Sequence, residues 1–393
     1  MRRLSGVSVC KLVSINDIPE THELVRGFLF GHFSDTIALV RFYICGLHNS
    51  GDGEQNMTSD QSPILKINKL DFNWVTQDPF LFCVHHRDAY PAGESDFGPP
   101  AASLEGRNMG QDFTLKDGWR MYHGSRVPGF PAHPHRGFET VTIVLDGYVD
   151  HSDSHGASGR YGEGDVQWMT AGSGLQHAEM FPLLNQDKPN PGELFQIWLN
   201  LPQKNKMVDP HYKMLWSEDI PTYLGKGVSI RIIAGSYEGL TPPAPAPDSW
   251  ASDPASAVTI WIITLAPGTD WELPPVSANH NRSLYFYQGA ELTIADRVFP
   301  VSHSLDLRAD LPLTIKNGDQ ESHLLLLQAK PIGEPVAQYG PFVMNDREGL
   351  EQAFSDYNRT QFGGWPWDRR DPVHGSKMQR FARYSDGSEE VRS

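Results

Sequence analysis

The sequence predicts an all-β protein made of two β-rich halves and a short C-terminal helix. Its 393 residues include 36 glycines and 30 prolines, which favours many turns and short strands over long helices. From residue 67 onward, short apolar runs are separated by Gly, Pro and Asp, the pattern of a β-barrel or β-sandwich. A proline-rich segment at 242–247 is extended and stiff, and it separates the two halves.

Strands are expected at regular intervals in both halves. Those of the first half are 79–84, 140–145, 166–169 and 194–199, and those of the second are 258–265, 283–287 and 323–328. Asp146-Gly147 predicts a hairpin turn after the second of these strands. We therefore predict a first barrel over 65–210, a linker region over 211–248 and a second barrel over 249–343.

The helix is predicted within 344–393, followed by a loose tail. Asn345 can cap it and Glu348, three residues on, completes a capping-box-like start. An apolar stripe at helical spacing follows, consisting of Leu350, Ala353, Phe354 and Tyr357. Gly363-Gly364 ends the helix, and the charged segment after it is expected to be loose.

Residues 1–64 lack a clean period and are predicted to be an added extension. A polar run at 50–56 precedes Met57. Three interpretations stay open: a targeting segment, a disordered arm, or a gene model that starts upstream of Met57. No membrane span is expected, because charged residues interrupt the most apolar N-terminal run, 27–47.

Charge and cysteine content restrict partners and compartment. The net charge of −15 argues against direct nucleic-acid binding and against anionic membranes as partners. Three cysteines, Cys10, Cys45 and Cys83, cannot form a disulfide framework, which favours a reducing compartment. We expect a monomer in the cytoplasm, the nucleus or both, with organelle targeting by the extension kept open.

Two short motifs in the first half predict a metal site. His133 and His135 are two residues apart, as are His177 and Glu179. Residues i and i+2 of a strand project from the same face, so each pair can direct two ligands into one space. Three imidazoles and a carboxylate suit a divalent transition metal and leave open positions for substrate or oxygen on a six-coordinate ion.

The spacing alone does not choose the carboxylate. Glu139 has the same strand parity as His133 and His135, so it competes with Glu179. His151, Asp153 and His155 are expected in a solvated polar loop. Other candidates are expected to be structural, namely His85, His86, Arg136, Trp168 and Met169.

The second half is expected to carry no metal. Laying 283–289 on 140–147 places Pro275 and Ser277 where His133 and His135 stand. The nearest analogue of the second pair is Glu321-Ser-His323, in reversed order. We therefore predict one metal site, in the first half.

Several long motifs follow one another along the chain and together carry a family resemblance. The segments 133–142, 164–174 and 177–180 resemble the pirin family closely, and 339–345 resembles its C-terminal signature. This resemblance covers roughly residues 67 to 363. It implies a bicupin of two antiparallel, jelly-roll-type β-barrels that face each other, with the metal in the first. It also implies that His133, His135, His177 and Glu179 are the ligands. Iron(II) is the expected metal, and copper, manganese, nickel and zinc are alternatives.

The resemblance implies two classes of function. The first is a flavonol (quercetin) 2,3-dioxygenase that uses dioxygen, with Glu179 as ligand and base. The second is a metal- or redox-dependent transcriptional co-regulator that binds a protein partner without turnover, for which an acidic chain suits a basic partner. A sugar-phosphate isomerase ranks last, because no basic cluster surrounds the ligand pairs. The chain departs from short family members in its extension, an insertion at 88–127 and its tail, which leaves the substrate open.

Overall fold

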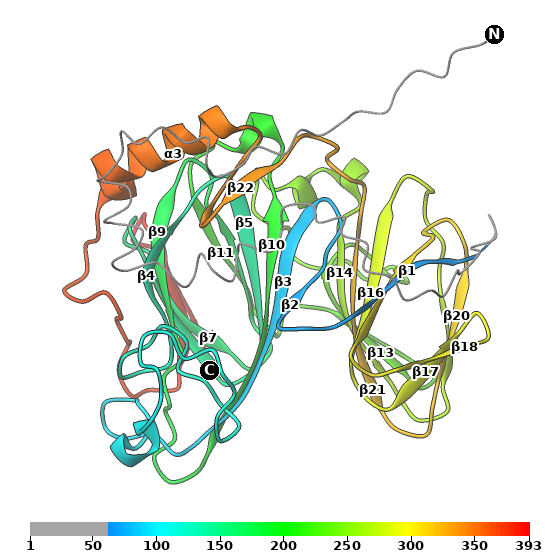
Figure 1. Cartoon of the computed structure of the whole chain (residues 1–393), viewed down its shortest axis with the longest axis horizontal. Coiled ribbons are helices and arrows are strands. Elements are labelled where there is room, and N and C mark those ends of the chain that lie inside the picture. Colours follow the sequence, from blue (N-terminus) through cyan, green and yellow to red (C-terminus); the bar gives the residue numbers. More distant parts are fainter. Residues whose placement is uncertain (1–61) are drawn as a thin grey trace. The chain divides into compact units, whose positions relative to one another are not determined.

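The computed structural model describes residues 62–393, and strands dominate this part of the chain (Figure 1). Its only α-helix is α3 (Arg347–Thr360), so the predicted all-β class with a C-terminal helix is confirmed. The predicted extension, with Met57, Cys10 and Cys45, lies outside the described residues except for its end, where β1 (Ile64–Lys69) begins. No helix in the described range is long and apolar enough to cross a membrane.

The first barrel is formed by two six-stranded antiparallel sheets. The sheet nearer the second barrel, named the inner sheet, has the order β11-β8-β5-β10-β3-β2, and the outer sheet has the order β25-β24-β7-β6-β9-β4. The inner strands are β2 (Asn73–Trp74), β3 (Phe80–Tyr90), β5 (Phe138–Asp146), β8 (Val166–Thr170), β10 (Asn190–Asn200) and β11 (His211–Leu215). The outer strands are β4 (Gly129–His135), β6 (Tyr148–Asp153), β7 (Ser158–Gly162), β9 (Leu175–Met180), β24 (Arg380–Arg383) and β25 (Glu389–Arg392).

The second barrel pairs a seven-stranded sheet with a four-stranded one, and a separate hairpin follows it. The larger sheet contains β1, β19 (His303–Leu307), β16 (Asn281–Gln288), β21 (Ser322–Ala329), β14 (Thr259–Leu265), β13 (Val228–Ala234) and β12 (Thr222–Gly225), in that order. The smaller sheet contains β15 (Asp270–Leu273), β20 (Leu313–Asn317), β17 (Glu291–Ile294) and β18 (Arg297–Pro300). The hairpin consists of β22 (Ala337–Tyr339) and β23 (Phe342–Met344).

A shared apolar core joins the two barrels. Val141, Ile143 and Phe195 of the inner sheet pack in one cluster with Ile260 and Leu325 of the seven-stranded sheet. Alternate residues of a strand face opposite sides, so the residues between these on β5 and β10 face the interior of the first barrel. Those interior positions include Thr142 and Gln196, so polar side chains line part of the interior of the first barrel.

The interior of the second barrel is apolar instead. It is filled by buried side chains such as Ile263, Leu284 and Leu324. Pro275 and Ser277 lie in an exposed loop between β15 and β16. Glu321 and His323 approach each other within 3.1 Å at the surface, where the glutamate side chain is 59% exposed.

Two predicted boundaries are wrong. The stretch 211–248, predicted as a linker, contains β11, β12 and β13, of which the first completes the inner sheet and the others join the second barrel. Alternation of Val228, Ile230 and Ile232 is a strand signal that the sequence does carry. Strand β1, predicted with the first barrel, pairs with β19 of the second, and such long-range pairing has no local signature.

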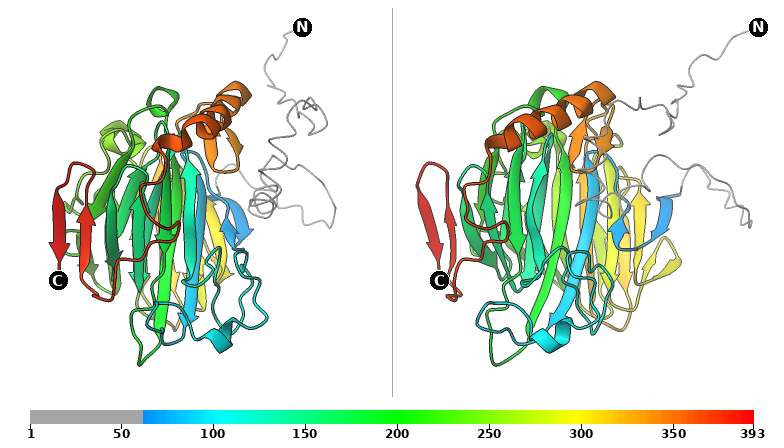
Figure 2. Two further views of the ribbon diagram at one scale, coloured as in Figure 1. Left: turned by 90° about the vertical axis from the view of Figure 1, so that its left-hand side faces the viewer. Right: turned by 60° about the vertical axis from the view of Figure 1, so that its left-hand side comes forward.

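The tail after α3 is ordered, which corrects the prediction of a loose segment. It runs along the outer sheet, and β24 pairs with β7 (Figure 2). The Trp367 Nε1 donates to the Asp153 carbonyl at 2.8 Å, and His374 Nε2 lies 2.7 Å from the His151 carbonyl oxygen. These contacts attach the tail to the sheet that carries all four predicted ligands, two on β4 and two on β9.

The N-cap of helix α3 lies one residue later than predicted. Asp346, not Asn345, accepts a hydrogen bond from the Gly349 N–H at 2.7 Å. The Asn345 side chain instead donates through Nδ2 to the Pro335 carbonyl. Both residue types are good caps, so sequence alone could not decide between neighbours. The predicted apolar stripe is confirmed: it packs against Phe342 and Phe362.

Replacing Arg380 with methionine is expected to destabilise the fold by about 3 kcal/mol, because it leaves a buried carboxylate without its cation. Arg380 Nη1 donates to Asp165 Oδ1 at 2.8 Å, and the Asp165 side chain is fully buried. Arg383→Met, on the same strand, is the matched control, since its 61% exposed side chain should contribute below about 1 kcal/mol. Urea unfolding measures both, and equal losses would contradict a role for the Asp165 pair.

Candidate metal centre

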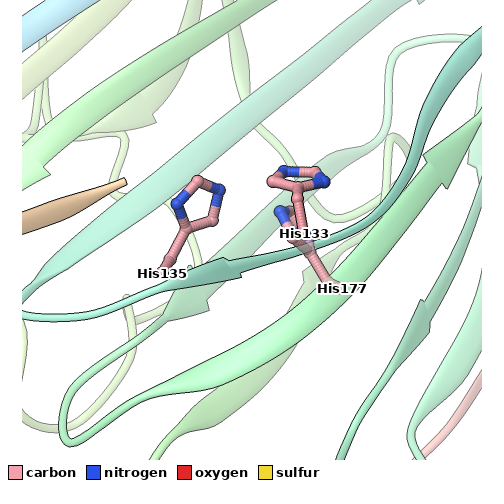
Figure 3. Close-up of side chains that lie close together, drawn as sticks. All are labelled: His133, His135 and His177. Atoms are coloured by element: carbon pink, nitrogen blue, oxygen red, sulfur yellow. The ribbon is translucent and has the colours of Figure 1, made fainter. Parts of the chain in front are cut away.

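Strands β4 and β9 place three imidazoles together inside the first barrel. The two strands are antiparallel neighbours, and His133 stands directly opposite His177. His135 projects beside them, two residues further along β4 (Figure 3). Ligand atoms of His133, His135 and His177 all lie within 4.8 Å of one another. In the described part of the chain this is the only such group of three potential ligands.

Hydrogen bonds orient two of the rings. His133 Nδ1 lies 2.9 Å from the Pro131 carbonyl oxygen, and His135 Nδ1 lies 3.4 Å from that of Pro341. A carbonyl only accepts, so each Nδ1 carries the proton and each Nε2 keeps its lone pair. Outer contacts of this kind fix the tautomer that binds metal.

The surroundings of His177 indicate whether these residues fit a metal. Its side chain is fully buried, and neither ring nitrogen has a hydrogen-bond partner among the described residues. Buried polar atoms are normally paired, so an unpaired imidazole beside two others fits a missing metal–nitrogen bond. Burial also lowers the pKa of His133 to about 4 and lowers the pKa of His135 and His177. All three are then neutral at pH 7, which is the form that binds a metal.

Glu179 stands next to this cluster. Its Oε2 lies 3.6 Å from His177 Nε2. Gln196 Nε2 lies 3.0 and 2.9 Å from the two carboxylate oxygens, and Thr142 Oγ1 lies 3.4 Å from one of them. Burial raises the pKa of Glu179, and the Gln196 hydrogen bonds oppose that shift. The carboxylate therefore lies beside the cluster, in surroundings where burial disfavours its charged form and the Gln196 amide favours it.

Glu139, the alternative carboxylate, is not at the cluster. Strand β4 ends at His135 and β5 starts at Phe138, so strand parity does not carry across the turn. Gly137 in that turn has φ +84°, and a Cβ there would lie 2.0 Å from the Val343 carbonyl oxygen. Glu139 consequently faces away from the interior of the first barrel. On that opposite side its carboxylate accepts hydrogen bonds from Thr170 and Ser249.

Glu139 gives the stability of the protein a pH dependence. Burial raises the pKa of Glu139 to about 7. Between the unfolded value of about 4.3 and 7, the native state holds more protons than the unfolded chain, so stability falls as pH rises, by up to about 4 kcal/mol. Glu139→Gln should flatten this fall, measured by urea unfolding from pH 5 to pH 8. A constant difference from the parent protein at every pH would contradict this.

Two residues expected in solvent are buried near the site. His151 and Asp153 are fully and almost fully buried, whereas His155 is exposed as predicted. His151 stacks on Tyr212, with ring centroids 4.7 Å apart, and lies 5.6 Å from the His177 ring. Strand β6 pairs with β9 and sets His151 opposite Glu179, a long-range contact that sequence spacing does not reveal.

Gln196 is the functional candidate that sequence reasoning missed. The run 194–199 was predicted as a strand, and a polar residue between Phe195 and Ile197 signals a position facing the opposite side. The alternation thus predicts that Gln196 faces the interior, but nothing in the sequence indicates that it contacts Glu179. Arg136 was expected to be structural, and it forms an ion pair with helix α3, with Nη1 2.9 Å from Asp356 Oδ2.

The half-buried interior residues mark the accessible side of the site. They are Phe82, Phe130, His133, Gln196 and Trp198. The insertion at 88–127 contributes to this side, because Tyr122 contacts Phe130 with ring centroids 5.2 Å apart. Phe130 in turn lies 6.3 Å from the His133 ring. An aromatic wall therefore borders the imidazole cluster.

Family models match both barrels. The Pirin model matches residues 99–199, and the Pirin C-terminal cupin domain model matches residues 260–363. A Pseudomonas aeruginosa protein with the provisional name quercetin 2,3-dioxygenase is 33% identical over 316 residues, covering 79% of this chain and 96% of that protein. A pirin-like protein of Caulobacter vibrioides is 39% identical over 237 residues, covering 60% of this chain and 80% of its own length.

A solved structure shows the same architecture. The crystal structure of quercetin 2,3-dioxygenase from Acinetobacter baumannii superimposes with a TM-score of 0.61 at 26% sequence identity. The match covers 77% of this chain and 98% of that chain. The two-barrel arrangement of the present chain is thus shared along the full length of that protein.

Proposed function

The chain belongs to the pirin family, and from this membership and its site we propose that it is a metal-dependent dioxygenase that cleaves flavonols such as quercetin. One observation carries the proposal: three imidazoles inside the first barrel, two of them with a bare Nε2, gather beside a carboxylate. Similarity to proteins named quercetin 2,3-dioxygenase supports the substrate class.

His133, His135 and His177 are proposed to hold the metal, with Glu179 as a further ligand and iron(II) as the expected ion. This donor set of nitrogen and oxygen atoms accepts several divalent ions, so copper, manganese, nickel and zinc stay alternatives. The bound metal would supply Lewis acidity toward a flavonol oxygen and a path for electrons from the substrate to dioxygen.

Glu179 is proposed to take the proton of the flavonol 3-hydroxyl. Its raised pKa suits a base that must accept this proton and later return it. The flavonolate then reacts with dioxygen: two carbon–carbon bonds of the central ring break, both oxygen atoms enter the ester product, and one carbon leaves as carbon monoxide. The half-buried Trp198 and Phe130 would contact the planar substrate and exclude water from the opening.

Oxygen-dependent release of carbon monoxide from quercetin tests the proposal. The full chain, purified with its native metal, is assayed with and without oxygen while bound metal is quantified. We expect about one carbon monoxide per quercetin consumed, and none without oxygen. Bound metal with no turnover of any flavonol would overturn the enzyme proposal and favour the metal-dependent binding function.

A further inference from the structure

A chain of two hydrogen bonds leads from the opening of the first barrel to Glu179. Trp198 Nε1 lies 3.2 Å from Gln196 Oε1, and Gln196 Nε2 lies 3.0 and 2.9 Å from the two oxygens of Glu179. Trp198 and Gln196 are two residues apart on β10, so both face the interior. The spacing of the two residues on β10 therefore agrees with the hydrogen bond between their side chains.

The indole fixes the direction of the amide. An indole N–H can only donate, so it selects the oxygen end of the Gln196 amide. The nitrogen end is then directed at Glu179, which as a carboxylate only accepts. With the amide reversed, donor would face donor at Trp198 and acceptor would face acceptor at Glu179. Trp198 thus sets the polarity of the whole chain.

Packing holds the indole itself in place. Its ring lies 4.2 Å from that of Phe138, 5.3 Å from that of Phe82 and 5.3 Å from that of His135, measured between ring centroids. Contacts on several sides restrict the rotamer of a large side chain. A rigid donor is therefore presented to Gln196 at the edge of the imidazole cluster.

We propose that Gln196 is a positioning residue that sets the orientation of the Glu179 carboxylate beside the three histidines, and that Trp198 fixes the Gln196 amide for this task. One donor group shared by both oxygens holds the carboxylate in one plane and limits its rotation. Thr142 adds only a longer contact of 3.4 Å, so Gln196 dominates. The expected effect on kcat rests on the proposed dioxygenase function, but the expected orientation of the Glu179 carboxylate does not.

Gln196→Leu removes the amide at similar length, and Trp198→Phe removes the indole N–H but keeps an aromatic ring. Trp250→Phe is the matched control, because that indole donates to the Lys330 carbonyl at 2.9 Å away from the site. Each protein is loaded with cobalt(II), and its visible d–d absorption is recorded with the bound cobalt per chain. Steady-state kcat and KM for quercetin are measured on the native-metal proteins.

We expect Gln196→Leu to bind cobalt like the parent but with a changed d–d spectrum, and to lower kcat about 10- to 100-fold with a much smaller change in KM. Trp198→Phe should change the d–d spectrum and kcat in the same direction but by less. Trp250→Phe should change neither the spectrum nor kcat. An unaltered spectrum in a folded Gln196→Leu protein overturns the proposal. Should that variant not fold, an unaltered Trp198→Phe spectrum overturns it. Absence of turnover in the parent protein counts against the dioxygenase only, since the spectra still test positioning.

Discussion

His177→Ala is expected to abolish stable metal binding and, with it, turnover. His177 is fully buried, and its two ring nitrogens have no hydrogen-bond partner among the described residues, so its proposed contribution is to the metal. Structural zinc sites of four ligands bind with about 10–16 kcal/mol, or roughly 3 kcal/mol per ligand. Losing one ligand should therefore weaken metal affinity at least about 100-fold. The measurement is metal per chain after dialysis, together with quercetin turnover.

His155→Ala provides the control for that experiment. His155 lies in the same half of the chain but is exposed, so its removal should alter neither metal content nor turnover. A His177→Ala protein that kept a full equivalent of tightly bound metal would show that the metal lies elsewhere. In that case both the proposed ligand set and the proposed function would fail together.

Glu179→Gln is expected to lower kcat by about 10²- to 10⁴-fold while the three histidines still hold metal. The amide has nearly the shape of the carboxylate but cannot accept the substrate proton at neutral pH. Its oxygen can still accept from Gln196, so the fold around it should persist. Turnover is measured under air at known metal content, and the value is expressed per bound metal.

Glu139→Gln is the matched control, because Glu139 is an equally buried glutamate of the same barrel that faces away from the cluster. It should leave kcat unchanged at pH 7. Loss of metal in Glu179→Gln, in parallel with activity, would mean that the ligand role outweighs the role as base. Full metal and full turnover would contradict both roles.

Local patterns in the sequence are sufficient to predict the fold class, the C-terminal helix and the two predicted ligand pairs. The all-β class followed from short apolar runs between turn residues, and α3 followed from a stripe at helical spacing that does pack against Phe342 and Phe362. The two predicted ligand pairs at i and i+2 could be recognised because side chains of a strand alternate with a period of two residues. Such signals survive in sequence because they depend on neighbours only a few positions apart.

Tertiary structure decided what depends on pairing between distant strands. Glu139 shares the parity of His135, yet a turn at Gly137 directs it to the opposite side. His151 and Gln196 approach Glu179 only because β6 pairs with β9 and because β10 faces β9 across the barrel interior. The tail joins the outer sheet through β7 by the same kind of contact. Strand register and sheet order are set by the burial of whole faces, a sum over many residues that no short motif encodes.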